Sequence, residues 1–158
     1  MVDVRQAVVE DADEIARLRG VMLGALDGVT EDERGWREHS AETLRKQLAD
    51  PEGAMAVFVV DRPGEPGTVA ACAVGSIDQR LSSPRNPSGL VGYVFSVATE
   101  EAYRRRGYSR ACMEALLEWF RRRGVTVVDL HASKYGVALY TSLGFAPTDD
   151  PALRLRMG

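Results

Sequence analysis

The residues with the clearest capacity for chemistry lie at 104–109, where the chain reads Arg-Arg-Arg-Gly-Tyr-Ser. An apolar run at 90–97 precedes them and an apolar stripe at helical spacing follows, so the sequence predicts a strand, a turn and a helix start. The first N–H groups of a helix have no acceptor inside it and carry partial positive charge from the peptide dipoles. The arginines add donors, and Gly107 allows a ligand to approach the backbone closely. This stretch is therefore predicted to bind an anion such as phosphate.

A basic run can also be no more than a solvated helix start. The strand before this run and the glycine at its end favour the phosphate interpretation. A second arginine run at 121–123 ends the same predicted helix before Gly124, where cations complement the helix dipole. We predict no site there.

Other kinds of catalytic site find little support in the chain. It lacks G-x-x-x-x-G-K-[ST] and G-x-S-x-G, and no G-x-G-x-x-G follows its first predicted strand. The two histidines, His39 and His131, are far apart and have no partners at metal-ligand spacing, so no metal site is predicted. Cys72 and Cys112 each lie among apolar residues, which favours two buried, reduced thiols.

Composition bounds the class of protein. With 158 residues, 45% of them hydrophobic and 27% charged, residues 1–158 are predicted to form a single domain. The 20 basic and 23 acidic residues give a net charge of -3, which argues against bulk attraction to nucleic acid. No apolar run is long enough to span a bilayer and no leader follows Met1, so we expect a cytoplasmic protein with no membrane partner.

The elements that must position the turn are strands and helices in an order typical of an α+β fold, with one β-α-β crossover and a largely antiparallel remainder. Their boundaries follow from apolar periodicity and from Gly, Pro and Asp at the breaks. The predicted order is a strand at 2–7, a helix capped at 10–13, a polar break at 24–33, a helix ending at 50–51, strands at 55–60 and 68–77 joined by a turn at 62–67, a loop at 79–88, a strand at 90–97, a helix after 107, a strand at 125–131, a helix at 134–142 and a last strand at 153–157.

With the turn at 104–109 and a second motif, Tyr140-Thr141-Ser142-Leu143-Gly144-Phe145, the chain resembles the GNAT-type N-acetyltransferase superfamily over nearly its whole length. Arg104, Gly107 and Ser109 fit the family's coenzyme A loop, Q/R-x-x-G-x-G/A, with serine in place of the last glycine or alanine. A later motif, asparagine followed by Tyr-x-x-Leu-Gly-Phe, is matched by four residues: Tyr140, Leu143, Gly144 and Phe145. Ser133 stands at the asparagine position, and Gly136 stands where alanine is common.

The resemblance implies a mixed, mostly antiparallel sheet that is splayed at its centre and flanked by about four helices. Acetyl-CoA, as co-substrate, would lie in the opening with its pyrophosphate on the N–H groups of residues 105–110. Backbone groups of Val97 and Ala98 would hold the pantetheine arm and polarise the thioester carbonyl. The cofactor-binding residues implied in this way are Val97, Ala98, Arg104, Arg105, Arg106, Gly107, Tyr108, Ser109, Arg110 and Ser133.

The resemblance also makes Tyr140 the general acid that protonates the leaving thiolate, the alternative being a core tyrosine whose hydroxyl reaches the surface. For the general base, Asp78 or His131 is the candidate, with a surface carboxylate and a packed histidine as the alternatives. Glu100 and Glu101 are too close to the turn to be attractive bases and are expected to pair with its arginines instead. No cysteine is placed to form an acyl-enzyme, which favours direct transfer.

The predicted function is therefore an acetyl-CoA-dependent N-acetyltransferase acting on a primary amine, most simply of a small molecule, with peptide amines as the alternative acceptor. Residues 24–40, including Trp36 and His39, and the loop at 79–88 are predicted acceptor walls, unless they are plain surface loops. A non-catalytic acetyl-CoA or CoA sensor is the second hypothesis, and a nucleic-acid binder the third. A homodimer is expected through pairing of the last strand across a two-fold axis.

Overall fold

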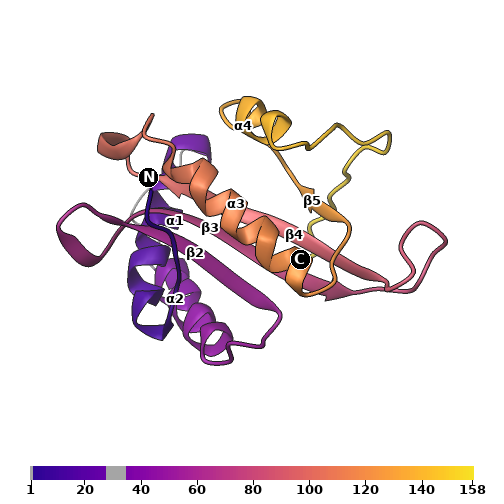
Figure 1. The fold of residues 1–158 in the computed structure, drawn as a ribbon, viewed down its shortest axis with the longest axis horizontal. Helices are drawn as coiled ribbons and strands as arrows, with labels where there is room; N and C mark the ends of the chain where they lie inside the picture. The colour runs from indigo at the N-terminus through magenta and orange to yellow at the C-terminus, as the bar shows by residue number, and fades with distance from the viewer. Residues whose placement is uncertain (1, 28–34) are drawn as a thin grey trace.

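A five-stranded sheet forms the centre of the computed structural model, which describes residues 2–27 and 35–158 (Figure 1). Among the described residues, four α-helices and two short 3-10 helices accompany the sheet. In chain order the elements are β1 (Arg5–Gln6), the 3-10 helix η1 (Val9–Asp11), α1 (Ala12–Asp27), α2 (Gly35–Leu48), β2 (Met55–Arg62), β3 (Glu65–Gln79), β4 (Leu90–Thr99), the 3-10 helix η2 (Glu101–Tyr103), α3 (Tyr108–Arg122), β5 (Val128–Leu130) and α4 (Val137–Ser142).

The sheet is antiparallel except at one edge. Its order is β1-β2-β3-β4-β5, and only β4 and β5 run parallel, with α3 as the crossover between them. The parallel pairing extends from Gly92↔Val128 to Val94↔Leu130, whereas β4 continues to Thr99. The end of β4 therefore extends beyond its pairing with β5. This arrangement confirms the predicted α+β fold with a mixed, splayed sheet.

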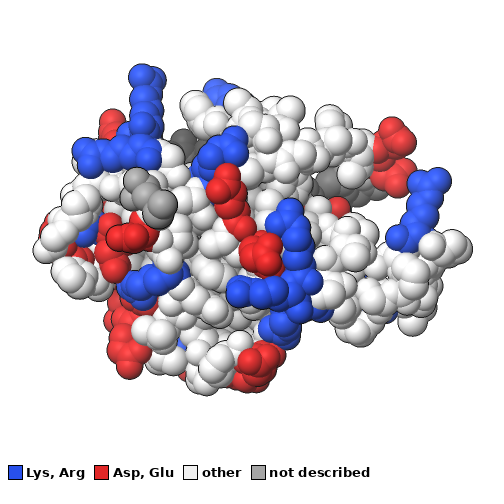
Figure 2. Space-filling view, in the orientation of Figure 1, with Lys and Arg blue, Asp and Glu red and all other residues white. Residues whose placement is uncertain are grey.

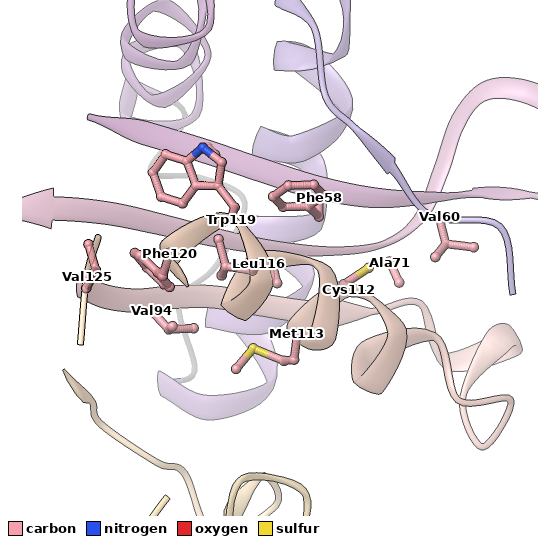
Figure 3. Close-up of a cluster of buried hydrophobic side chains, with 12 residues drawn as sticks. Phe58, Val60, Ala71, Val94, Cys112, Met113, Leu116, Trp119, Phe120 and Val125 are labelled. Carbon is pink, nitrogen blue, oxygen red and sulfur yellow. The ribbon is translucent and has the colours of Figure 1, made fainter. Parts of the chain in front are cut away.

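Helices cover both faces of the sheet. In β2, Ala56, Phe58 and Val60 belong to the core formed with α3, while Val57 and Val59 belong to the core formed with α1 and α2. Successive strand residues point to opposite faces, so a strand covered on both sides is apolar throughout rather than alternating. Figure 3 shows the α3 side of this core.

Two glycines allow α3 to lie directly on the sheet backbone. A Cβ atom at Gly75 would lie 2.7 Å from Leu116 Cδ1, and one at Gly92 would lie 2.7 Å from Phe120 Cε1. Carbon atoms in contact need about 3.5–4.0 Å. Any side chain at these two positions would thus push α3 away from the strands. The glycines fix the depth at which this helix packs.

In the second arginine run, Arg123 has a structural role. The Arg123 guanidinium donates hydrogen bonds to Gly53 O at 2.9 Å and Glu52 O at 3.0 Å, and it lies 5.2 Å from the Trp119 ring centroid. These contacts join the end of α3 to the loop before β2. Figure 2 shows basic and acidic side chains interspersed on one face of the molecule, rather than a continuous basic surface.

Several boundaries differ from the prediction. α1 continues to Asp27, so the break predicted at 24–33 begins within a helix, because good helix formers around Gly24 outweigh one glycine; its residues 28–33 lie outside the described part of the chain. β2 and β3 extend toward each other until only Pro63 and Gly64 separate them. The strands predicted at 2–7 and 125–131 shorten to Arg5–Gln6 and Val128–Leu130, because beyond the paired residues only single hydrogen bonds, at Ala7 and Val127, reach the neighbouring strands.

The prediction of a last strand at 153–157 is wrong. Residues 151–158 form neither helix nor strand, and Leu153, Leu155 and Met157 are 90%, 81% and 88% exposed. Alternating apolar residues form a stable strand only when a neighbouring edge pairs with them and one face is buried, and neither condition is met. The homodimer stays a prediction, without the strand on which it was based.

Candidate active site

A cleft of about 650 Å³ opens where β4 extends beyond β5, between α1, the start of α3 and α4. It brings together seven of the predicted site residues: Val97, Ala98, Arg104, Arg105, Ser109, Ser133 and Tyr140. Val21 and Met22 of α1 close the opposite side. Segments that are far apart in the sequence therefore meet at the splayed edge of the sheet.

The turn before α3 has the geometry that an anion requires. Arg105 and Gly107 both have left-handed backbone conformations, with φ of 65° and 78°. The first hydrogen bond of the helix runs from Ala111 N to Gly107 O at 3.0 Å, so the N–H groups of residues 108–110 have no acceptor within the helix. A Cβ on Gly107 would meet no atom within 4 Å, which shows open space over the turn. The turn fits a pyrophosphate group in both donors and space.

The side chains of the turn divide into two groups. Arg104 and Arg105 line the cleft, and Arg104 Nε lies 3.3 Å from Thr99 O. Arg106 and Tyr108 instead pack against Tyr103, with the Arg106 guanidinium 5.1 Å from that ring and the two tyrosine rings 6.3 Å apart. Of the three arginines at 104–106, Arg106 therefore adds no side-chain contact to the cleft lining.

Two side-chain contacts hold the turn in place. Ser109 Oγ and Thr99 Oγ1 are 2.6 Å apart, which joins the start of α3 to the end of β4. Arg110 donates a hydrogen bond to Ser142 Oγ on α4. The serine that replaces glycine or alanine in the family pattern is thus part of the scaffold.

Glu100 does not pair with the loop arginines, contrary to expectation. Its carboxylate accepts hydrogen bonds from Arg62 Nε and Nη2 at 2.7 and 2.6 Å, and from Arg17 Nη2 at 3.3 Å. The Arg62 hydrogen bonds are the main reason why the pKa of Glu100 is lowered. Arg17 on α1 and Arg62 on β2 thus take the place expected for the loop arginines, and Arg104 and Arg105 line the cleft without a carboxylate partner among the described residues.

A β-bulge lies in β4 at the edge of the cleft. The β3–β4 register shifts between Cys72 and Val74, and Ser96 has a left-handed φ of 52°. Phe95 and Ser96 consequently both face α1, since Phe95 packs in the α1 core and Ser96 Oγ accepts a hydrogen bond from Arg19. A bulge bends the strand and leaves one residue unpaired, so Val97 and Ala98 enter the cleft from a bent strand.

Tyr140 lies on α4 inside the cleft. A Cβ atom at Gly136 would be 2.6 Å from Tyr140 Cε2, and the Phe145 ring lies edge-on at 6.0 Å. Glycine in place of the common alanine therefore makes room for the tyrosine ring. Burial raises the pKa of the Tyr140 phenol, which stays protonated at neutral pH. Ser133, whose carbonyl accepts a hydrogen bond from Gly136 N at 3.0 Å, lines the same wall.

The two candidate bases do not line the cleft. Asp78 lies near the far end of β3, where its carboxylate accepts a 3.0 Å hydrogen bond from Arg80 Nε. His131 is exposed after β5, with Nδ1 3.2 Å from the Tyr93 hydroxyl. No carboxylate side chain is found among the described residues that line the cleft.

Both cysteines are buried and unpaired, as predicted. Burial raises the pKa of the Cys72 thiol to about 12, and it also raises that of Cys112. A buried thiol that stays protonated is not a nucleophile. Within residues 2–27 and 35–158 no group of three His, Cys, Asp or Glu side chains could hold a metal ion. None of the helices described is long and apolar enough to cross a membrane.

The predicted acceptor walls also divide. Trp36 and His39 line a second cavity, on the α1 and α2 side of the sheet, whereas residues 79–88 line neither that cavity nor the cleft. Sequence reasoning missed Thr99, Gly136 as a packing partner of Tyr140, and the bulge at Ser96. Only the unusual glycine at 136 gave a signal in the sequence.

Comparison with known proteins agrees with this geometry. A predicted acetyltransferase from Clostridium acetobutylicum, in a structure with acetyl-CoA, has a TM-score of 0.83 and 22% identity to this chain, and the match covers 99% of this chain and 96% of that one. Glucosamine-6-phosphate N-acetyltransferase from Arabidopsis thaliana has a TM-score of 0.73 and 17% sequence identity to this chain, and the match covers 98% of each chain. Ribosomal-protein-alanine N-acetyltransferase from Brucella melitensis has a TM-score of 0.68 and 18% sequence identity, and the match covers 100% of each chain. These structures define the fold as that of an acetyltransferase.

A family model narrows the assignment. The model of the acetyltransferase (GNAT) family matches residues 23–145. The chain belongs to the GNAT acetyltransferase family, and it is an acetyl-CoA-dependent N-acetyltransferase. A search of curated protein sequences finds no match.

Proposed function

We propose that residues 1–158 act as one domain that moves the acetyl group of acetyl-CoA directly to a primary amine of a small molecule. The observation that supports this proposal is the cleft itself, which the turn before α3, the end of β4 and Tyr140 all line. A donor whose pyrophosphate lies on that turn would place its thioester near the bent strand and the phenol. Direct transfer is favoured because both cysteines are buried.

The donor would be held mainly by backbone groups. The N–H groups of residues 108–110 would bind the pyrophosphate, with charge added by Arg104 and Arg105. Val97 and Ala98 would offer backbone groups to the pantetheine arm and one N–H to the carbonyl oxygen as charge develops on it. Ser133 would contribute from the part of the cleft that Tyr140 also lines. Arg106, Tyr108 and Arg110 would support the turn, since their side chains have partners outside the cleft or on α4.

Tyr140 would supply the proton for the leaving group. The amine nitrogen forms a bond to the acyl carbon, the carbon–sulfur bond breaks, and the sulfur takes the proton of the Tyr140 hydroxyl. This hydroxyl has no hydrogen-bond partner among the described residues, and burial raises its pKa. It is therefore an available and protonated donor.

The proton of the attacking amine requires a separate acceptor. Of the two candidates, His131 is the better proposal, because it precedes Ser133 by two positions and is not held by a cation. Asp78 is paired with Arg80. A chain of water molecules is the alternative acceptor.

The test is release of coenzyme A thiol over a panel of primary amines by the wild type, Tyr140→Phe and the control Tyr103→Phe. General acids contribute typically about 10²–10⁴-fold, so kcat of Tyr140→Phe should fall within that range while Tyr103→Phe stays near wild type. Full turnover by Tyr140→Phe across the pH range would exclude this role. Tight acetyl-CoA binding without turnover on any amine would favour the sensor module.

A further inference from the structure

The second cavity lies on the α1 and α2 side of the sheet and has a volume of about 440 Å³. Its walls are largely apolar, with Ile15, Trp36, Leu44 and Phe95 among them. The titratable side chains that line it are Arg19 and His39, and no carboxylate is among the described lining residues. A volume of this size suits a small molecule.

Arg19 has no ion-pair partner in the described part of the chain. Arg17, one helical half-turn earlier on α1, shows the contrast, since it pairs with Glu14 at 2.8 Å and Glu100 at 3.3 Å. Arg19 is also half-buried, but its one hydrogen bond goes to the neutral hydroxyl of Ser96. A guanidinium group has five N–H donors, so most of its donors are available to a ligand.

An unpaired cation beside apolar walls is costly to maintain, and an anion that accepts its hydrogen bonds removes that cost. The planar guanidinium matches a carboxylate with two parallel hydrogen bonds. A phosphate group carries more charge, and no second arginine or lysine lines the cavity within the described residues. The chemistry of the cavity therefore favours one carboxylate and an apolar group beside it.

Two segments of the chain run from the cavity to the cleft. Phe95 and Ser96 line the cavity, and the next two residues of β4, Val97 and Ala98, line the cleft. Arg19 likewise precedes Val21 and Met22, which line the cleft from α1. A molecule anchored at Arg19 would thus lie against the strand segment that leads to the proposed thioester site.

We infer that the acetyl acceptor is an amino acid-like molecule, with its carboxylate on Arg19 and its apolar side chain against Phe95 and Trp36. The inference rests on the proposed transfer to a small-molecule amine and names the class of that amine. Arg19 would be a specificity-determining residue. It would select acceptors through their carboxylate and exclude amines that lack one.

The experiment compares L-leucine with L-leucinamide, and L-phenylalanine with L-phenylalaninamide, as acceptors for the wild type, Arg19→Gln and the matched control Arg45→Gln. Arg45 is a surface arginine of α2 that pairs with Asp13 and lines neither cavity discussed above. The measured quantity is the acid-to-amide ratio of kcat/KM, compared between variants so that the different basicity of the two amines cancels. A hydrogen-bonded charge contributes typically about 1.5–3 kcal/mol, so the ratio should fall about tenfold to a hundredfold in Arg19→Gln and stay unchanged in Arg45→Gln. O-phosphoethanolamine tests whether a phosphate replaces the carboxylate.

An Arg19→Gln enzyme with the wild-type ratio, a wild type that prefers the amides, or a preference for O-phosphoethanolamine over both amino acids would overturn the inference. Binding separates this failure from failure of the proposed function. L-leucine titrated into each variant in the presence of coenzyme A is followed by the fluorescence of Trp36, which lines the cavity. A saturable signal in the wild type that is lost in Arg19→Gln supports the carboxylate site even if no amine turns over. If the wild type gives no signal with L-leucine but turns over other amines, the carboxylate site at Arg19 is excluded while the acetyltransferase proposal stands.

Discussion

Replacing Gly92 by alanine tests whether α3 rests on the sheet backbone as closely as the structure shows. The added methyl group would lie 2.7 Å from Phe120 Cε1 and 2.9 Å from Phe120 Cδ1, about 1 Å short of ordinary carbon contact. Phe120 is 1% exposed, and its ring also lies over Gly75, so the ring has no free space into which to move. The helix or the ring must therefore shift.

The expected cost follows from these distances. Overpacking a core costs about 1–3 kcal/mol, while alanine in place of glycine restricts the unfolded chain and offsets about 0.4–1 kcal/mol. The net loss for Gly92→Ala is then about 1–2 kcal/mol, or roughly 2–8 °C in Tm for a chain of this length. Phe120 lies near the C-terminal end of α3, whereas the cleft is at the start of that helix. At temperatures below the unfolding transition, kcat/KM of Gly92→Ala should therefore stay near the wild-type value.

Urea unfolding measures this loss directly, with Gly35→Ala as the matched control, because a Cβ at Gly35 meets nothing within 4 Å. A smaller side chain in place of the Phe120 ring provides a second control. Phe120→Leu should recover part of the lost stability in the Gly92→Ala background, whereas Phe120→Leu alone should be destabilising. Gly92→Ala with the stability of Gly35→Ala would refute the close packing of α3.

Two further predictions concern the turn and its support. Gly107→Ala should raise KM for acetyl-CoA and leave KM for the amine unchanged in steady-state kinetics, because alanine in a left-handed conformation costs about 1–2 kcal/mol and its methyl group would project over the turn; an unchanged KM for acetyl-CoA would contradict the phosphate role. Glu100→Gln should lower the free energy of unfolding at pH 7. The difference from wild type should shrink as the pH falls below 4.5, the ordinary carboxyl pKa, because the stability that a carboxylate with a lowered folded-state pKa contributes is complete above its unfolded pKa and is lost as the pH falls through the folded one. Urea titrations between pH 7 and pH 3.5 measure it, and a difference independent of pH would argue against the ion pairs with Arg62 and Arg17 as its source.

Much of the cleft lining could be predicted from the sequence, because its determinants are local. A strand, a turn with Gly107 and an amphipathic helix follow one another without a gap, and each has its own composition. Tyr140 also follows from a short motif. In both places, neighbours along the chain decide the structure.

The rest depends on contacts between segments that are distant in the sequence. The partner of Glu100 proved to be Arg62 on β2 rather than the adjacent loop, because the β2 side chain is held in place by the sheet. The alternating residues at 153–157 were misleading for the same reason, since a strand needs an edge to pair with and residue pattern alone does not supply one. Arg19 gave no signal at all, because its lack of a carboxylate partner exists only in three dimensions.

One irregularity in β4 connects both sides of the site. The bulge at Ser96 turns Phe95 and Ser96 toward α1, and the alternation resumes with Val97 on the α3 side and Ala98 on the α1 side. A regular strand would direct residues 95 and 96 to opposite faces, and the hydroxyl that meets Arg19 would point toward α3 instead. The same bend occurs just beyond Val94, where pairing with β5 ends. Left-handed backbone at a non-glycine residue is unfavourable and persists where the surrounding structure requires it. The bulge therefore lies between the cleft proposed for acetyl-CoA and the cavity proposed for the acceptor, so the two substrates would meet at a single bent segment of one strand.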